Sequence, residues 1–266
     1  PVQVFDDDSS TLVVVGSPII DETINRDYIW LQFKKNRIPS DFLRNINGEF
    51  LLISLDKSTG KVQISVDRYT SIPLFYFVDE TGFHGYVFYK DLWMHQKRNG
   101  KIKLNEHAIF EFLWLQRLLG SKTYDNSSAF LLAATTLTYV DGQLSTSRYW
   151  VPSFVKTHDS VDQSAHKLAG LLRQSIKRKT SDVPGNIGLF LSGGTDSRTI
   201  LGAFDDPPLS FTIGVSNNNE VQIARTVASI VDSKHKYVPF PSDPYSDSID
   251  ALTMLGGGMH AFDHSI

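Results

Sequence analysis

The first 150 residues contain short hydrophobic runs and regular alternation of hydrophobic and polar positions, and both patterns predict β-strands. Val62, Ile64 and Val66 alternate with polar residues, so their strand is expected to expose one face to water. The expected strands are residues 11–16, 49–56, 61–68, 73–79 and 86–91, followed by a hairpin around Asp141-Gly142.

One helix is expected within this β-rich half. Asn105 is a suitable N-cap, and hydrophobic residues recur near helical spacing as far as Leu119, directly before Gly120. The pattern therefore predicts a helix from residue 105 to residue 119.

The pattern changes after residue 157. Residues 163–178 predict an amphipathic helix, whose hydrophobic stripe is Leu168, Leu171, Leu172 and Ile176. Hydrophobic strands at 187–191, 209–215 and 235–240 then alternate with helices at 198–203 and 220–231. The second of these helices is expected to face inward with Ile223, Val227, Ile230 and Val231. This β-α-β-α-β order implies a parallel sheet that binds ligands at the carboxyl ends of its strands.

Composition excludes several classes of function. The 266 residues carry a net charge of −3, with 41% hydrophobic and 21% charged residues, which is typical of a soluble globular protein. Neither a nucleic-acid partner nor a membrane partner is expected, since the charge is balanced and no apolar run could span a bilayer. The absence of cysteine excludes disulfides, thiolate metal sites and cysteine nucleophiles, and favours a cytoplasmic location.

Residues 192–197, Ser-Gly-Gly-Thr-Asp-Ser, stand between a predicted buried strand and a predicted helix. Glycines let the backbone approach a polyanion, and free N–H groups before a helix point toward it. Ser192 and Ser197 add hydroxyl donors. The carboxylate of Asp196 would repel phosphate unless a Mg²⁺ ion lay between them. The segment predicts a phosphate site, and the alternative is an ordinary serine- and glycine-rich turn.

This loop lacks the lysine of the G-x-x-x-x-G-K-S/T phosphate loop. It resembles the S-G-G-x-D-S signature of the PP-loop ATP pyrophosphatases, which split ATP between the α and β phosphates and adenylate an acceptor. The resemblance implies ATP and Mg²⁺ as ligands, with Asp196 as the catalytic and metal-binding residue. The residues that it implies for ATP binding are Leu191, Ser192, Gly193, Gly194, Asp196, Ser197, Ile213 and Gly214.

Short sequence motifs in the first half resemble those of the N-terminal amidotransferase-like domain of the asparagine synthetase and β-lactam synthetase family. They are Asn47-Gly48-Glu49-Phe50, Val66-Asp67-Arg68, Pro73-Leu74-Phe75-Tyr76, Leu137-Thr138-Tyr139, Asp141-Gly142 and Arg148-Tyr149-Trp150. The implied fold is an α+β domain, residues 1–155, with an Ntn-amidotransferase-like β sandwich. The implied second domain, residues 156–266, is the first part of an α/β parallel-sheet PP-loop nucleotide-binding domain.

The chain departs from that family at its nucleophile, because the family uses an N-terminal cysteine and this chain begins with Pro1. We therefore expect no glutaminase activity. The resemblance implies an ATP-dependent ligase that adenylates a carboxylate, releases AMP and pyrophosphate, and forms an amide with an amine. The alternatives are an asparagine synthetase whose cysteine is missing from this chain, and a non-catalytic nucleotide-binding or scaffold protein.

Three features stay open at this stage. The family's second signature, S-G-E-G-S-D-E, is absent, so we expect a fragment or a truncated product. These residues do not identify the acceptor substrate, and a homodimer is left open. Arg198, in the first turn of the predicted helix, could reach an anion or lie in solvent. His260 and His264 have the spacing of metal ligands, but incidental histidines are favoured because no third ligand completes a site.

Overall fold

The computed structural model describes residues 1–100, 102–181, 183, 185–214, 216–240, 248–255 and 257–259. His260 and His264 lie outside the described residues. Contacts divide the chain into two compact units. Unit 1 comprises Pro1–Ile20, Ile24–Ser153 and Ser248–Ile266, and unit 2 comprises Asp21–Thr23 and Phe154–Asp247.

Unit 1 is a mixed α/β unit built on antiparallel pairings. Its larger sheet has the strand order β1-β2-β4-β5-β9-β10, with β3 paired to β2, and its smaller sheet has the order β7-β6-β8. The strands are β1 (Val2–Asp6), β2 (Ser10–Ile20), β3 (Thr23–Ile24), β4 (Asn47–Asp56), β5 (Lys61–Val66), β6 (Phe75–Asp79), β7 (Gly82–Tyr86), β8 (Ala129–Phe130), β9 (Thr135–Val140) and β10 (Gln143–Arg148). The helices are α1 (Arg26–Asn36), α2 (Ser40–Asn45), α3 (Tyr89–Arg98), α4 (Glu106–Leu115) and α8 (Ile249–Leu255).

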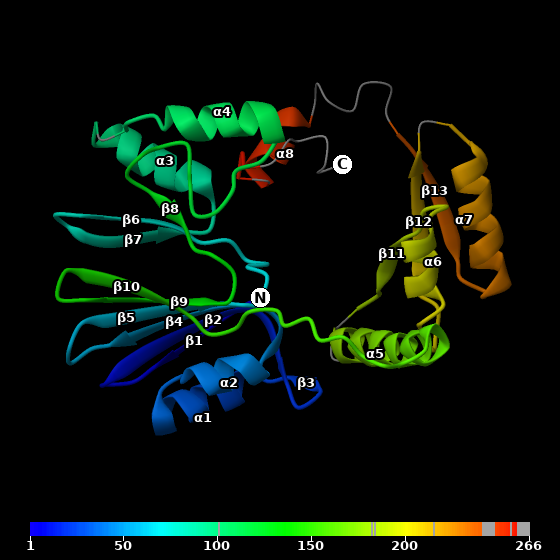
Figure 1. The fold of residues 1–266 in the computed structure, drawn as a ribbon, viewed down its shortest axis with the longest axis horizontal. Helices are drawn as coiled ribbons and strands as arrows, with labels where there is room; N and C mark the ends of the chain where they lie inside the picture. Colours follow the sequence, from blue (N-terminus) through cyan, green and yellow to red (C-terminus); the bar gives the residue numbers. More distant parts are fainter. Residues whose placement is uncertain are drawn as a thin grey trace. The chain divides into compact units, whose positions relative to one another are not determined.

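Four layers follow one another in unit 1 (Figure 1): α1 and α2, the larger sheet, the smaller sheet, then α3 and α4. Each interface has its own buried cluster. Phe50 and Leu52 pack with Ile29 and Phe33 of α1, whereas Leu51 faces the opposite side of the same strand. The alternation along β4 therefore supplies two cores, one against the helices and one between the sheets. A third cluster joins Phe75 and Phe77 of the smaller sheet to Tyr89, Leu92 and Met259.

The predicted sandwich is present, and α4 is the helix predicted from residue 105, although it ends at Leu115 rather than at residue 119 because Gln116 adopts a left-handed conformation. The helices α1, α2 and α3 were not predicted. The strand expected at residues 86–91 is wrong, because β7 ends at Tyr86 and α3 begins at Tyr89. In α3 the buried residues are Tyr89, Leu92 and Gln96, so a glutamine interrupts the hydrophobic pattern of the inward face. The N-cap Asn105 is confirmed, since its side chain accepts a hydrogen bond from Ala108 N.

One buried carboxylate organises the loop between β5 and β6. Asp67 is 1% exposed. It accepts hydrogen bonds from the backbone N–H groups of Phe50 at 3.2 Å, Tyr69 at 2.8 Å and Ser71 at 3.0 Å, and from the Ser71 hydroxyl at 3.2 Å. At Val66, the residue before Asp67, the carbonyl oxygen accepts a hydrogen bond from the Tyr149 hydroxyl at 2.8 Å. Three of the sequence motifs listed above, which contain Phe50, Asp67 and Tyr149, are therefore joined by hydrogen bonds around one loop.

Thr70, in the same loop, has a φ of 53°, and its buried Oγ1 has no hydrogen-bond partner in the described structure. A left-handed backbone costs a residue with a Cβ about 1–2 kcal/mol, and a β-branched residue is especially unsuited to it. We expect Thr70→Gly to stabilise the protein by up to about 1 kcal/mol in urea unfolding, after the added backbone entropy of glycine is subtracted. Thr146→Gly in strand β10 is the control, and it should destabilise. A lower unfolding midpoint for Thr70→Gly would contradict the strain.

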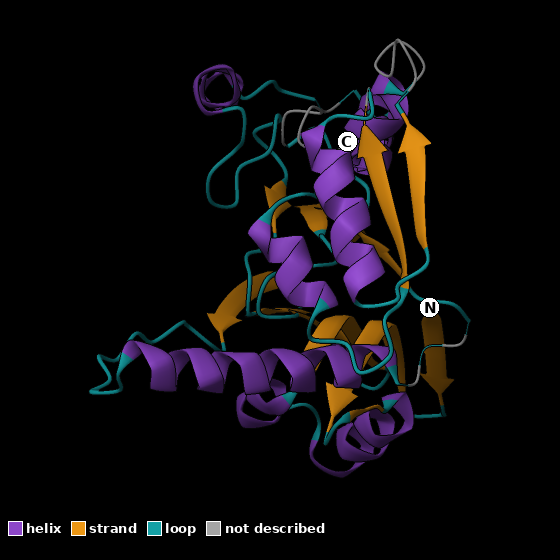
Figure 2. Ribbon diagram, turned by 90° about the vertical axis from the view of Figure 1, so that its right-hand side faces the viewer, coloured by secondary structure: helices purple, strands orange, loops and turns teal. Residues whose placement is uncertain are grey.

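Unit 2 contains a parallel sheet in the order β11-β12-β13 (Figure 2), as predicted. Its elements are α5 (Val161–Thr180), β11 (Gly188–Phe190), α6 (Thr195–Leu201), β12 (Leu209–Gly214), α7 (Asn219–Ile230) and β13 (His235–Pro239). The inward face of α7 differs from the prediction. Ala224 and Ala228 are fully buried, whereas Ile223 and Ile230 are 43% and 76% exposed. Val227 and Val231 pack against this core as predicted, so the prediction is correct for these two residues and wrong for the two isoleucines. Small side chains at Ala224 and Ala228 let α7 approach the sheet closely.

The helix α5 begins at a capping box. Ser160 and Gln163 exchange hydrogen bonds between their side chains and backbone N–H groups, which satisfies the first turn. Of the predicted stripe, Leu168 and Leu171 are 67% and 63% exposed. Within the described ranges, no helix has the length and hydrophobicity that crossing a membrane requires.

Candidate nucleotide-binding site

The serine- and glycine-rich loop lies where the sequence predicts it, between the carboxyl end of β11 and the start of α6. The helix begins at Thr195, with Gly194 as its N-cap, and no side chain caps it. The predicted start at residue 198 was three residues late, because the loop motif itself continues into the helix. Ser197 therefore lies on the first turn of α6 and faces back toward Ser192.

The two loop serines are hydrogen-bonded to each other. Ser192 Oγ and Ser197 Oγ are 2.8 Å apart, and Ser192 N donates to Ser197 Oγ at 3.0 Å. Ser192 Oγ also accepts from Gly194 N at 3.2 Å. The donors that a phosphate would use thus satisfy one another within the loop, and a bound anion would replace these contacts with shorter, charge-assisted ones.

Gly193 is packed against the start of α7. A Cβ at this position would lie 3.1 Å from both Cα and Cγ of Glu220, and the Cα belongs to the backbone of α7. Glycine therefore suits this close approach of two backbones, since a Cβ would make a tight contact with Glu220. Glu220 was missed in the sequence, since its position beside the loop follows from the packing of α7 and leaves no mark in the spacing of the motif.

Asp196 lies in the first turn of α6 and is exposed. No hydrogen bond or ion pair to its carboxylate is present among the described residues, and these also contain no group of three metal-binding side chains. A free carboxylate beside a set of phosphate donors suits Mg²⁺, which usually takes one or two protein carboxylates and completes its shell with phosphate oxygens and water. The donor set therefore fits Mg²⁺ held jointly with a nucleotide.

Arg198 folds back over the loop. Its Nε donates to Gly194 O at 3.0 Å and its Nη2 to Thr195 Oγ1 at 3.5 Å. The guanidinium is thus anchored at one edge and exposed elsewhere. The sequence left two alternatives, a ligand of an anion and a side chain in solvent, and this exposed side chain bonded to the loop itself does not decide between them.

The remaining predicted ATP-site residues lie at the ends of β11 and β12. The Leu191 side chain is 1% exposed and packs with Leu201, Ala224 and Ala228, so it belongs to the core and, contrary to the prediction, does not line an ATP pocket. Ile213 is 46% exposed on the strand end. Gly214 O accepts from the Tyr237 hydroxyl and from Phe240 N, both at 2.8 Å. The structure thus gathers the predicted residues at one edge of the sheet.

A cavity of about 630 Å³ lies elsewhere in unit 2. It is lined by Ile187, Leu209 and Lys234, which stand at or before the first residues of the three strands. This is the amino edge of the sheet, whereas α/β sheets bind nucleotides beyond the carboxyl ends of their strands. The volume of the cavity therefore does not bear on the phosphate loop.

Comparison with known proteins points to one family. The asparagine synthase family model matches residues 167–257, the segment that contains the phosphate loop. A Methanocaldococcus jannaschii protein named "Putative asparagine synthetase (glutamine-hydrolyzing) 2" is 26% identical over 231 residues, which are 83% of this chain and 44% of that protein. Both comparisons show that the chain is similar to asparagine synthetases. This asparagine synthetase-like chain thus spans less than half the length of the curated relative that it matches.

Two solved structures also resemble the asparagine synthetase-like chain, at 10% identity each. One is the glutamine phosphoribosylpyrophosphate amidotransferase of B. subtilis complexed with ADP and GMP, with a TM-score of 0.32 over 88% of this chain and 47% of that chain. The other is described as the allosteric regulatory enzyme of purine biosynthesis, with a TM-score of 0.31 over 88% and 46%. At such scores neither structure bears on the function proposed below.

Proposed function

We propose that this chain belongs to an ATP-dependent carbon–nitrogen ligase that adenylates a substrate carboxylate. The observation that carries the proposal is the loop of residues 192–197, which lies at the carboxyl edge of a parallel sheet with a free carboxylate, Asp196, beside it. The loop lies inside the segment that matches the asparagine synthase family model. The ligands of the site are ATP and Mg²⁺, and we place the enzyme in the cytoplasm.

In this reaction the protein must position the substrate carboxylate against ATP and neutralise the negative charge of the phosphates. A carboxylate oxygen of the substrate attacks the α-phosphorus, the bond to the β-phosphate oxygen breaks, and pyrophosphate leaves. An amine then attacks the acyl carbon and AMP departs, which leaves an amide. Mg²⁺, when bound, offsets the charge of the phosphates. The N–H groups and hydroxyls of Ser192, Gly194 and Ser197 would bind phosphate oxygens, and Asp196 would hold the metal.

The nitrogen donor is proposed to be an amine other than glutamine. The relative from M. jannaschii is named as glutamine-hydrolysing, but this chain contains no cysteine to attack glutamine. Unit 1 would then support the ligase without hydrolysing an amide. A homodimer remains a prediction.

Two measurements on the protein test this function. Calorimetric titration is expected to show binding of Mg·ATP, and binding of Mg·GTP should be weaker, since the loop accepts any triphosphate while the strand ends meet the base. Incubation with glutamine should release no glutamate above the uncatalysed rate. Absence of Mg·ATP binding would refute the nucleotide site. Glutamate release that heat inactivation abolishes would instead favour a glutamine-dependent synthetase.

A further inference from the structure

A buried hydroxyl connects the last strand of unit 2 to the phosphate loop. Thr212, on β12, is 4% exposed. Its Oγ1 lies 2.6 Å from Leu191 O and 2.8 Å from His235 Nε2. Leu191 is the residue directly before Ser192, and His235 is the first residue of β13. One side chain on the central strand thus contacts both of its neighbours.

The direction of each hydrogen bond follows from the chemistry of the three groups. A threonine hydroxyl has a single hydrogen, and a carbonyl oxygen can only accept. The Thr212 hydroxyl must therefore donate to Leu191 O, and its own oxygen must accept from the imidazole. Nε2 of His235 consequently carries a hydrogen. This assigns the tautomer from the network, in which His235 donates to Thr212 and Thr212 donates to Leu191.

The carbonyl of Leu191 shares a planar peptide group with the N–H of Ser192. Fixing the direction of that oxygen also fixes the direction of the N–H, which points to Ser197 Oγ at 3.0 Å. The first amide of the loop is thus oriented by a hydrogen bond from the neighbouring strand. Leu191 N is fixed as well, since it donates to Phe211 O at 2.7 Å.

The surroundings of His235 favour the neutral imidazole that this network contains. Burial lowers the pKa of His235, and the positive charge of Arg225 on α7 lowers it further. In the neutral ring only one nitrogen carries hydrogen, so the bond to Thr212 decides which one it is. Without that donor, the buried Thr212 oxygen would lose the bond that it accepts, and an Nε2 without hydrogen would compete with Leu191 O for the Thr212 hydrogen.

We infer that His235 is a positioning residue of the phosphate loop, which acts through the Thr212 hydroxyl on the Leu191 carbonyl and so orients the first phosphate-binding amide. The part that concerns ATP rests on the proposed function. The geometry of the loop does not, and it can be measured without nucleotide.

The first test is the tautomer in the unaltered protein. Nitrogen NMR of the imidazole is expected to show a neutral ring with hydrogen on Nε2, and Thr212→Val should shift that signal. A ring with hydrogen on Nδ1 alone would overturn the inference. This measurement needs no variant of His235, so it remains decisive even if such a variant fails to fold.

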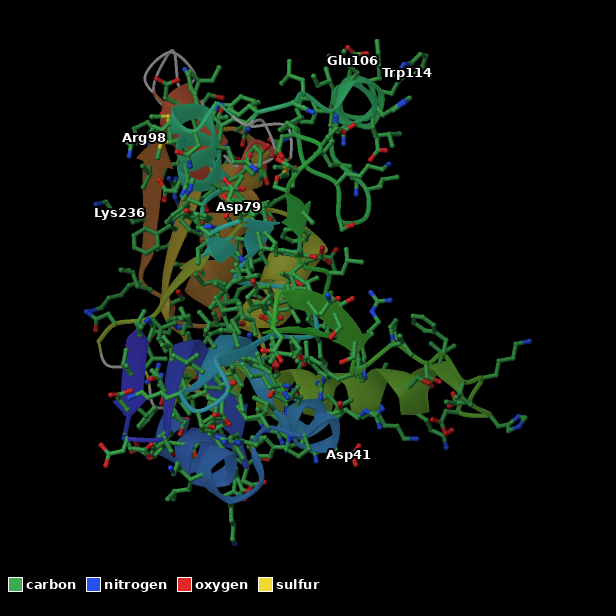
Figure 3. All side chains as sticks on the ribbon, turned by 90° about the vertical axis from the view of Figure 1, so that its left-hand side faces the viewer. Asp41, Asp79, Arg98, Glu106, Trp114 and Lys236 are labelled. Atoms are coloured by element: carbon green, nitrogen blue, oxygen red, sulfur yellow. The ribbon has the colours of Figure 1, made fainter. Side chains whose placement is uncertain are left out.

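The second test compares variants by amide hydrogen exchange and by titration with Mg·ATP. His235→Leu removes the donor, whereas the side-chain amide of His235→Gln can still donate. His235→Leu is expected to speed exchange at Ser192 and to weaken Mg·ATP binding, each by about tenfold, as for loss of one hydrogen bond. His235→Gln should restore both values. Lys236→Gln, on the opposite face of the same strand (Figure 3), is the control and should change neither.

The two proposals fail differently. If the unaltered protein binds Mg·ATP and His235→Leu leaves both exchange and affinity unchanged, the positioning role is refuted and the nucleotide site stands. If exchange responds as expected but the unaltered protein does not bind Mg·ATP, the positioning role stands and the proposed function is refuted.

Discussion

Asp196→Asn is expected to weaken binding of Mg·ATP by tenfold or more, while metal-free ATP binds equally well or more tightly. Two unit charges at about 4 Å repel by ~4 kcal/mol at an effective dielectric of about 20, so the carboxylate opposes free ATP. A Mg²⁺ ion between carboxylate and phosphate reverses that sign. Titration of both variants with Mg²⁺ and with EDTA measures the difference. Pyrophosphate release by the proposed ligase should fall by about a hundredfold.

The competing role for Asp196 is a helix cap, which asparagine would fill almost as well. The structure weakens that alternative, since Gly194 is the N-cap and Asp196 lies within the first turn. Loss of its charge should cost at most about 1 kcal/mol of stability through the helix dipole. Asp205→Asn, an exposed aspartate before β12, is the matched control and should not alter Mg·ATP affinity. Equal Mg·ATP affinity and turnover in Asp196→Asn would show the metal assignment to be wrong.

Asp67→Ala should be the most damaging single substitution in the loop between β5 and β6. It removes the acceptor of three backbone N–H groups and one hydroxyl inside unit 1. Each donor left buried without a partner costs about 1–3 kcal/mol, and relaxation of the loop toward water recovers part of that. We expect a loss of about 4 kcal/mol in urea unfolding, a large share of the stability of a typical domain.

Asp41→Ala provides the comparison for Asp67→Ala. The Asp41 side chain, which Figure 3 labels, is 90% exposed, and its one ion pair among the described residues is with Arg44, three residues on in the same helix. Surface substitutions of this kind usually change stability by no more than about 0.5 kcal/mol. Similar losses for the two variants would mean that Asp67 is not the organising group of its loop.

The sequence was informative wherever local chemistry determines structure. Asn105 was recognisable as an N-cap, since a short polar side chain there satisfies a free N–H whatever the rest of the fold. The loop of residues 192–197 was recognisable because glycine and serine at those positions have a direct physical use. The parallel order of β11, β12 and β13 followed from the alternation of strands and helices.

Features that depend on packing could not be read in this way. The buried residues of α7 include Ala224 and Ala228 as well as Val221, because small side chains fit the close contact with the sheet there. Gln96 is buried in α3 and donates to Ser127, which lies far away in the sequence. Glu220 lies next to Gly193 only because the first turn of α7 packs against the loop. In each case the partner that gives the residue its role is remote along the chain.

The contact between Gly193 and Glu220 makes the loop rigid on one side. A Cβ at Gly193 would already make a tight contact of 3.1 Å with the backbone of Glu220, so the loop has little room to move toward α7. Any adjustment to an incoming triphosphate must occur on the opposite side, where two hydroxyls hold each other. Hydroxyl groups can exchange partners by rotation about one bond, without backbone movement. Phosphate binding would therefore require rotation of the two serine hydroxyls but little movement of the loop backbone. Its cost in conformational entropy would be small.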